Sequence, residues 1–218
     1  MIDHVQVLHL AAGVFLLTAV GVLWRRQLPA KIRLLVVQGL ALAAMVGIIG
    51  VQRGDLALVL VAAGLAVLRA GVMPAVLRRA LVPGAQERRE TRPVVDVAAS
   101  LLAAALLTLL AYALTRPLVA LDPTPITAVL PVAVAVVLIG FFVLTTRRRA
   151  LSQVVGFLLL DNGITATAFL ATGGIPLVVE VGVSFDVLLI VLVLQMLTLR
   201  LRATVGTTDI NELRELRD

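Results

Sequence analysis

The sequence is dominated by apolar runs, each long enough to cross the hydrocarbon core of a bilayer as an α-helix of about 20 residues. Hydrophobic residues make up 61% of the 218 residues, more than a soluble domain of this size can bury in its core. Short connections with proline, glycine or aspartate separate the runs. The predicted spans are residues 5–24, 32–50, 56–77, 95–115, 126–145, 150–170 and 176–199. We therefore predict an all-α integral membrane protein with about seven transmembrane helices.

The basic residues predict how these helices are oriented. They gather in four segments, residues 25–33, 78–92, 147–149 and 200–217. The alternate connections hold Arg53 and Arg116. Because basic residues are enriched in cytoplasmic loops, we expect the N-terminus outside and the C-terminus in the cytoplasm. Their placement beside lipid headgroups also accounts for the net charge of +6, so the lipid bilayer, and not nucleic acid, is the expected partner of these charges.

The sequence offers few residues for metal or covalent chemistry. It has no cysteine, and its two histidines, His4 and His9, both fall in the first predicted span. Thiolates are the usual ligands of iron–sulfur clusters, and two histidines in one helix argue against a haem or di-metal centre. No phosphate-binding loop or nucleophile–base pair is found. We therefore expect no catalytic residue, metal or cofactor on this chain, so that any enzyme activity would belong to a larger complex.

Three acidic residues fall inside predicted spans, namely Asp161, Glu180 and Asp186. A carboxylate at the centre of a membrane helix costs about 2.5–3.5 kcal/mol on insertion scales and so marks a candidate functional site. Asp161 and Asp186 lie equally far from the Gly173–Gly174 turn, about 18 Å along each helix. Two carboxyls in one dry site cannot both be ionised cheaply, which makes each a candidate proton relay. Glu180 is a shallower candidate. The alternative for all three is a structural carboxyl that fixes helix packing.

Other side chains of the sixth predicted span are expected to support Asp161. Thr165 follows one helical turn later and is placed to hydrogen-bond to it, whereas Asn162 is placed to bond to a neighbouring helix or a water. Gly156 and Gly163 share one face of this helix, where small residues let a partner helix approach closely.

Two basic residues bear on the interior of the predicted bundle. Arg69 lies within the third predicted span, and we expect its long side chain to snorkel to the cytoplasmic end of that helix. Pairing with a carboxylate of another helix is the alternative. Lys31 precedes the second predicted span, so no lysine is expected inside a span. That absence argues against a complete antiporter with its own lysine-based pathway.

Residues 203–218 follow the last predicted span and carry the signals of a short cytoplasmic helix. A capping-box pattern begins at residues 208–209, and Ile210, Leu213 and Leu216 recur near one helix face. A neighbouring subunit would hold such a helix in place, whereas alone it would be a frayed tail.

The C-terminal region resembles a known family. Residues 152–164 read SQVVGFLLLDNGI, and residues 174–182 and 185–188 read GIPLVVEVG and FDVL. These stretches resemble the E component of hydrogenase-4, a membrane subunit of formate-hydrogenlyase-type group 4 hydrogenases. The last three predicted spans are also similar to the K subunit of respiratory complex I and to the C subunit of multisubunit cation/proton antiporters.

The resemblance carries expectations for individual residues. The K and C subunits have two membrane glutamates on successive helices and end in a motif like DINEL at residues 209–213. By helix position, Asp161 matches the first glutamate, and Asp186, rather than Glu180, matches the second. The implied regions are an N-terminal four-helix region, residues 1–125, a three-helix region, 126–202, and the cytoplasmic tail, 203–218.

The resemblance also implies a function. The chain would be a non-catalytic membrane-arm subunit of a hydrogenase-like, complex-I-like redox complex in the bacterial cytoplasmic membrane. It would contribute to proton, or sodium, translocation through its intramembrane carboxylates, while nickel–iron and iron–sulfur centres would be bound by partner subunits. Two alternatives stay open: a subunit of a multisubunit cation/proton antiporter without a redox arm, and a structural scaffold whose acids lock helices together.

Overall fold

The computed structural model of the chain describes residues 4–25, 27–79, 96–147 and 150–173. These residues form helices and no β-strand, and six helical spans among them are long and apolar enough to cross a membrane. The first six predicted spans are thus confirmed as long apolar helices. The seventh, at 176–199, lies outside the described residues together with Glu180, Asp186 and the tail at 203–218. The total of seven spans, and the sides on which the two ends lie, stay predictions.

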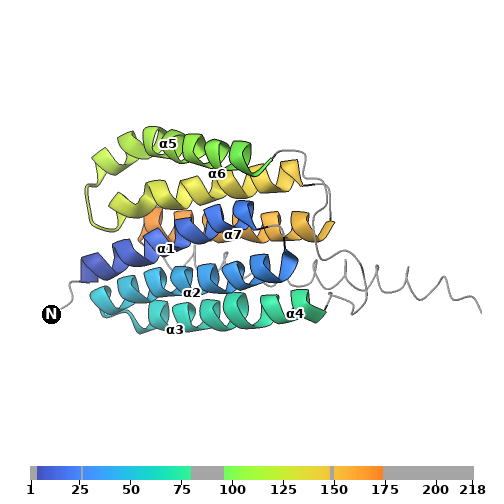
Figure 1. Cartoon of the computed structure of the whole chain (residues 1–218). Coiled ribbons are helices and arrows are strands. Elements are labelled where there is room, and N and C mark those ends of the chain that lie inside the picture. The colour runs from blue at the N-terminus through green and yellow to red at the C-terminus, as the bar shows by residue number, and fades with distance from the viewer. Residues whose placement is uncertain (1–3, 26, 80–95, 148–149, 174–218) are drawn as a thin grey trace, which may run out of the picture. The chain divides into compact units, whose positions relative to one another are not determined.

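The helices run alongside one another for most of their length (Figure 1). The first two spans are α1, His4–Trp24, and α2, Leu28–Arg53. The third span consists of α3, Leu56–Leu65, the π-helix η1, Ala66–Val72, and α4, Met73–Arg79. The others are α5, Val97–Leu121, the short 3-10 helix η2, Thr127–Val129, then α6, Leu130–Thr146, and α7, Ala150–Thr172.

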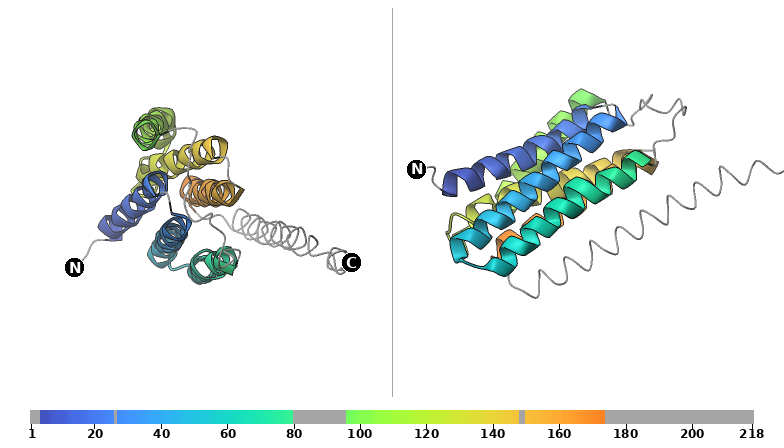
Figure 2. Two further views of the ribbon diagram at one scale, coloured as in Figure 1. Left: turned by 45° about the vertical axis from the view of Figure 1, so that its right-hand side comes forward. Right: turned by 90° about the horizontal axis from the view of Figure 1, so that it is seen from below.

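Four of the helices pack in a ring. Both α1 and α7 pack against α2 and α6, and Figure 2 shows α7 lying between these two helices. The third span packs against α2, and α5 packs against α6 and α1. Large apolar side chains of these helices are fully buried, among them Leu8, Phe15, Ile139 and Leu159. Within the ring, α7 therefore has α2 and α6 as direct neighbours.

Local signals in the sequence explain where several helices begin and end. Pro29 lies in the first turn of α2, where its missing N–H is not needed. Gly54 ends α2 with a φ of 65°, a left-handed conformation that glycine adopts without strain. Asp55 accepts backbone N–H bonds at the start of α3, and Asp96 does the same for α5. Each aspartate satisfies donors that the first helical turn leaves without an internal partner.

Glycines bring α6 and α7 into backbone contact. A Cβ added to Gly140 of α6 would lie 2.5 Å from a backbone nitrogen of α7. A Cβ on Gly156 or Gly163 of α7 would lie 2.8 or 2.6 Å from a backbone nitrogen of α6. The expectation that Gly156 and Gly163 admit a neighbouring helix is therefore confirmed, and Gly140 contributes the matching gap on the other helix.

The third span widens into a π-helix just before a proline. Pro74 has no N–H, and its ring crowds the carbonyl of Ala70 one turn earlier. The backbone N–H of Met73 bonds to the carbonyl of Leu68, which is the i to i−5 pattern of a π-helix. Within η1 the buried side chain is that of Arg69. The wider turn thus coincides with a cation that faces the protein interior.

Candidate functional site

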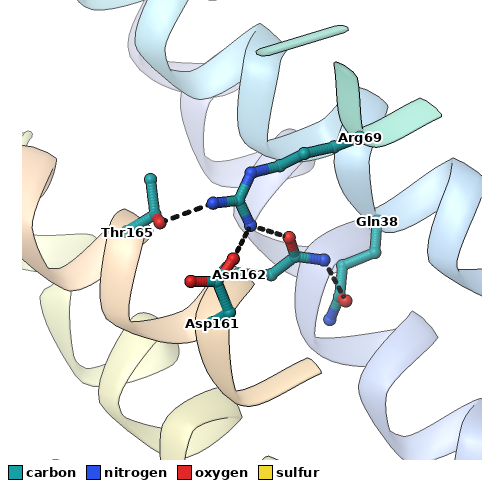
Figure 3. A network of polar contacts seen from close by, with 5 residues as sticks. All are labelled: Gln38, Arg69, Asp161, Asn162 and Thr165. Carbon is teal, nitrogen blue, oxygen red and sulfur yellow. Dashed lines mark hydrogen bonds and ion pairs between the residues drawn. The ribbon is translucent and has the colours of Figure 1, made fainter. Parts of the chain in front are cut away.

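Arg69 and Asp161 form an ion pair inside the helical bundle (Figure 3). Nη1 of Arg69 lies 2.8 Å from Oδ2 of Asp161, and the two side chains are 5% and 16% exposed. Arg69 comes from η1 in the third span, whereas Asp161 comes from α7. The contact joins residues far apart in the sequence and neutralises two charges that are each expensive to bury alone.

The guanidinium of Arg69 also donates hydrogen bonds to two further side chains of α7. Its Nη1 donates to Oδ1 of Asn162, and its Nη2 donates to Oγ1 of Thr165 at 2.8 Å. Asn162 and Thr165 are both buried. A planar guanidinium presents several N–H donors in a fixed fork, so one arginine can hold all three polar residues on this part of α7.

Two more helices extend this network. Nδ2 of Asn162 donates to Oε1 of Gln38 at 2.8 Å, and Nε2 of Gln38 donates to the carbonyl of Phe15 at 3.5 Å. Gln38 is completely buried in α2, and Phe15 belongs to α1. Each amide thus donates to one neighbour and accepts from another, which satisfies polar groups that would be costly to leave unpaired away from water.

A glycine lets the third span come close enough to α2 for this arrangement. A Cβ on Gly39 would lie 2.9 Å from Cβ of Arg69 and 3.1 Å from its carbonyl carbon. Gly39 follows Gln38 directly, so the residue that admits Arg69 adjoins the residue that orients Asn162. The contact with Gly39 therefore fixes the backbone position of Arg69, from which the side chain extends toward α7.

The network lies at the middle of the helices that build it. Asp161 is the central residue of the 23-residue α7. Phe15, Gln38 and Arg69 also lie well inside the candidate membrane spans His4–Trp24, Leu28–Arg53 and Leu56–Arg78. In helices that cross a bilayer, this position is the hydrocarbon core, where ionisable side chains are rare and usually functional.

The structure changes two expectations for polar residues and supports a third. Snorkelling of Arg69 to a helix end is wrong, because Arg69 is buried and pairs with Asp161. The hydrogen bond expected between Thr165 and Asp161 is replaced by one from Arg69 to Thr165. Asn162 bonds to a neighbouring helix as expected. The predicted sharing of a site between Asp161 and Asp186 stays a prediction, because Asp186 lies outside the described ranges, as does the shallower candidate Glu180.

Lys31 also lies where the sequence did not place it. Because α2 begins at Leu28, Lys31 is in the first turn of a candidate span, and it is buried. The expectation that no span contains a lysine is therefore wrong. Its Nζ lies 3.4 Å from Oγ of Ser152 in α7. The proline in the first turn of α2 was the signal for this earlier start, since proline is favoured at the first helical position.

The described residues contain no group of three or more His, Asp or Glu side chains placed to hold a metal ion. Their polar chemistry is instead that of an ion pair and its hydrogen-bonded neighbours. The fold and this site define a helical protein with several membrane-compatible spans and a charged, buried network at their middle.

Comparison with known proteins gives the family of the chain. It is 51% identical over 208 residues to the uncharacterized protein Rv0085 of Mycobacterium tuberculosis, a match that covers 95% of this chain and 94% of that protein. The chain belongs to the family of this mycobacterial protein.

A more distant similarity points to a hydrogenase subunit. The chain is 31% identical over 116 residues to hydrogenase-4 component E of Escherichia coli and of Shigella flexneri. The match covers 53% of this chain, and the chain spans about half, 54%, of those proteins. No protein-family model matches the chain, and no solved structure matches it.

Proposed function

We propose that this chain is a non-catalytic membrane-arm subunit of a hydrogenase-like, complex-I-like redox complex and that Asp161 takes part in proton, or sodium, translocation. The similarity to hydrogenase-4 component E supports membership in such a complex. The six long apolar helices support a place in its membrane arm. Nickel–iron and iron–sulfur centres would belong to partner subunits, and the complex would lie in the bacterial cytoplasmic membrane.

The observation that carries the role of Asp161 is its position in a charged network at mid-helix. A carboxylate that merely joined two helices would be as useful near a helix end, where burial costs less. Asp161 instead lies at the centre of α7, with side chains from the third span and α2 gathered beside it. We expect translocation to require an ionisable group at this depth, because a carboxylate there can bind the cation while it crosses the bilayer.

The proposal extends to the residues outside the described ranges. A seventh span at 176–199 would place Asp186 at the depth of Asp161, with Glu180 nearer the outer surface. The N-terminus would then lie outside and the C-terminus in the cytoplasm, as the basic residues favour. Residues 1–125 would form a four-helix region, 126–202 a region similar to the complex I K subunit, and 203–218 a tail that contacts other subunits.

A structural scaffold is the second candidate function, and one observation favours it. Polar contacts join three spans: Arg69 pairs with Asp161 and donates to Asn162, and Asn162 donates to Gln38. A hydrogen-bonded network of this kind holds the helices in one arrangement whether or not a cation crosses the membrane through the protein. A cation/proton antiporter subunit without a redox arm is the third candidate, and it would share the role of Asp161 with the first.

Proton translocation by the intact complex in vesicles tests the proposal. The chain is purified with its native partners, which are identified, and redox-driven proton uptake is measured. We expect Asp161→Asn to abolish translocation per assembled complex, with subunit levels measured alongside, and Asp161→Glu to retain most of it. Asp55→Asn is the matched control, because Asp55 caps α3 outside the network and asparagine caps a helix equally well.

The outcomes separate the three candidates. Full translocation by Asp161→Asn would contradict the relay and favour the scaffold. Partners that include antiporter subunits but no redox subunit would favour the antiporter. Loss of the chain from the membrane in Asp161→Asn, but not in Asp55→Asn, would show that the carboxylate is needed for packing.

A further inference from the structure

We infer that Arg69 is the internal cation of the Asp161 site, so that a proton or sodium ion taken up by Asp161 must displace the guanidinium. This inference rests on the proposed function, in which Asp161 binds a translocated cation. It makes Arg69 a positioning residue that controls when the carboxylate is available.

In the structure, the carboxylate of Asp161 is already paired with Arg69. Nη1 of Arg69 lies 2.8 Å from Oδ2 of Asp161, and the arginine side chain is 5% exposed. Away from water, opposite charges at this distance attract strongly, and a second cation beside the same carboxylate would be repelled by the guanidinium. A second cation therefore cannot join the pair at low cost. It has to take the place of Arg69.

The structure also gives the displaced guanidinium other contacts. Arg69 already donates to Asn162 and Thr165 on α7, so separation from Asp161 would leave two hydrogen bonds in place. Asn162 is in turn oriented by Gln38. Arginine keeps its charge in proteins, so these neutral acceptors would hold a guanidinium that has lost its carboxylate.

The proton step balances without any covalent change in Arg69. An O–H bond of a hydronium ion or of a protonated carboxyl breaks, leaving water or a carboxylate. The proton forms a new O–H bond on Asp161, and the ion pair separates. When the proton passes to a water molecule or to another carboxylate, that O–H bond on Asp161 breaks and Arg69 pairs with the carboxylate again. With sodium, the cation contacts the carboxylate oxygens and no bond to hydrogen forms.

Carbodiimide labelling of the full-length chain tests the inference without requiring translocation. Dicyclohexylcarbodiimide is an apolar reagent that enters membranes and reacts with protonated carboxyl groups. The purified chain is labelled in vesicles, and mass spectrometry measures the rate at the peptide that contains Asp161. We expect slow labelling in the wild type, labelling at least several-fold faster in Arg69→Gln, and slow labelling again in Arg69→Lys, which restores the charge.

A second variant gives a result of opposite sign. Thr165→Val keeps the shape of the side chain but removes one acceptor that would hold the displaced guanidinium. The displaced guanidinium depends on these neutral acceptors alone, so the bond to Thr165 contributes more after displacement than before it. Without this bond Arg69 should leave Asp161 less often, and labelling should be slower than in the wild type. A general loosening of the site would instead make labelling faster. If Arg69→Gln does not accumulate in membranes, Thr165→Val decides the question alone.

The results distinguish this inference from the proposed function. Equal labelling in wild type and Arg69→Gln, or unchanged or faster labelling in Thr165→Val, would overturn the role of Arg69. The translocation assay could still show that Asp161 is required. The opposite combination is the expected labelling pattern with full translocation in Asp161→Asn. It would support the role of Arg69 as internal cation and contradict the role of Asp161 in translocation.

Discussion

Gly39 of α2 lies directly against the backbone of Arg69, because a Cβ on Gly39 would be 3.1 Å from the carbonyl carbon of the arginine and 2.9 Å from its Cβ. The adjacent Gln38 accepts the hydrogen bond that orients Asn162. One short stretch of α2 therefore sets both the approach of the third span and the position of a partner of Arg69 on α7.

Gly39→Ala should destabilise the protein and displace Arg69. Overpacking at a tight backbone contact typically costs about 1–3 kcal/mol, so we expect a lower Tm in detergent. Gly47→Ala is the matched control on the same helix, where the added Cβ would meet its nearest atom at 3.4 Å, an ordinary contact. That control should be neutral or slightly stabilising, since alanine favours a helix by roughly 1 kcal/mol over glycine. Equal Tm changes in the two variants would contradict the close contact.

The Arg69–Asp161 pair should show strong coupling in a double-mutant cycle. Removing one partner leaves a buried charge uncompensated, which costs about 3–5 kcal/mol, so Arg69→Gln and Asp161→Asn should each lower stability. The double variant Arg69→Gln, Asp161→Asn carries no buried charge and should be less destabilised than the sum of the single variants. Thermal unfolding of the purified chain measures all four proteins. Additive effects would show that the two side chains do not interact.

The glycine contacts between α6 and α7 should be sensitive to a single methyl group. Gly163→Ala would press a Cβ to 2.6 Å from a backbone nitrogen of α6, so the helices must move apart at a cost of about 1–3 kcal/mol. Gly64→Ala in the third span is the control, because nothing lies within 4 Å of the added Cβ. The amount of protein in the membrane and its Tm should fall for Gly163→Ala and stay level for Gly64→Ala. A wild-type Tm for Gly163→Ala would refute the close packing.

Reporter fusions should place the ends of the chain. The positive-inside rule predicts cytoplasmic positions for fusions after residues 26, 85 and 148 and at the C-terminus. An alkaline phosphatase reporter is active outside and a fluorescent protein reporter inside, so the two give opposite readings at each position. An external C-terminus would contradict seven spans from an outside start, since the chain would then cross the membrane an even number of times.

Much of the fold follows from the sequence alone. Long apolar runs predicted six described spans because a lipid-exposed helix needs continuous apolar surface. Gly156 and Gly163 predicted a close helix contact, since a missing side chain on one helix face leaves room for a neighbour. Asp161 was identified as a candidate site residue by its depth in an apolar run. These features depend on residues near one another in the chain.

The partners of Asp161 were decided by the tertiary structure. Nothing local distinguishes an arginine that snorkels from one that turns inward, because the choice depends on which helix lies alongside and on which face the π-helix presents. Arg69 turns inward because Gly39 admits its backbone and α7 offers Asp161, Asn162 and Thr165 as partners. The sequence determined that charged groups lie inside long apolar helices. Helix packing decided that they meet, since an ion pair forms only between side chains that the folded chain brings within a few ångströms.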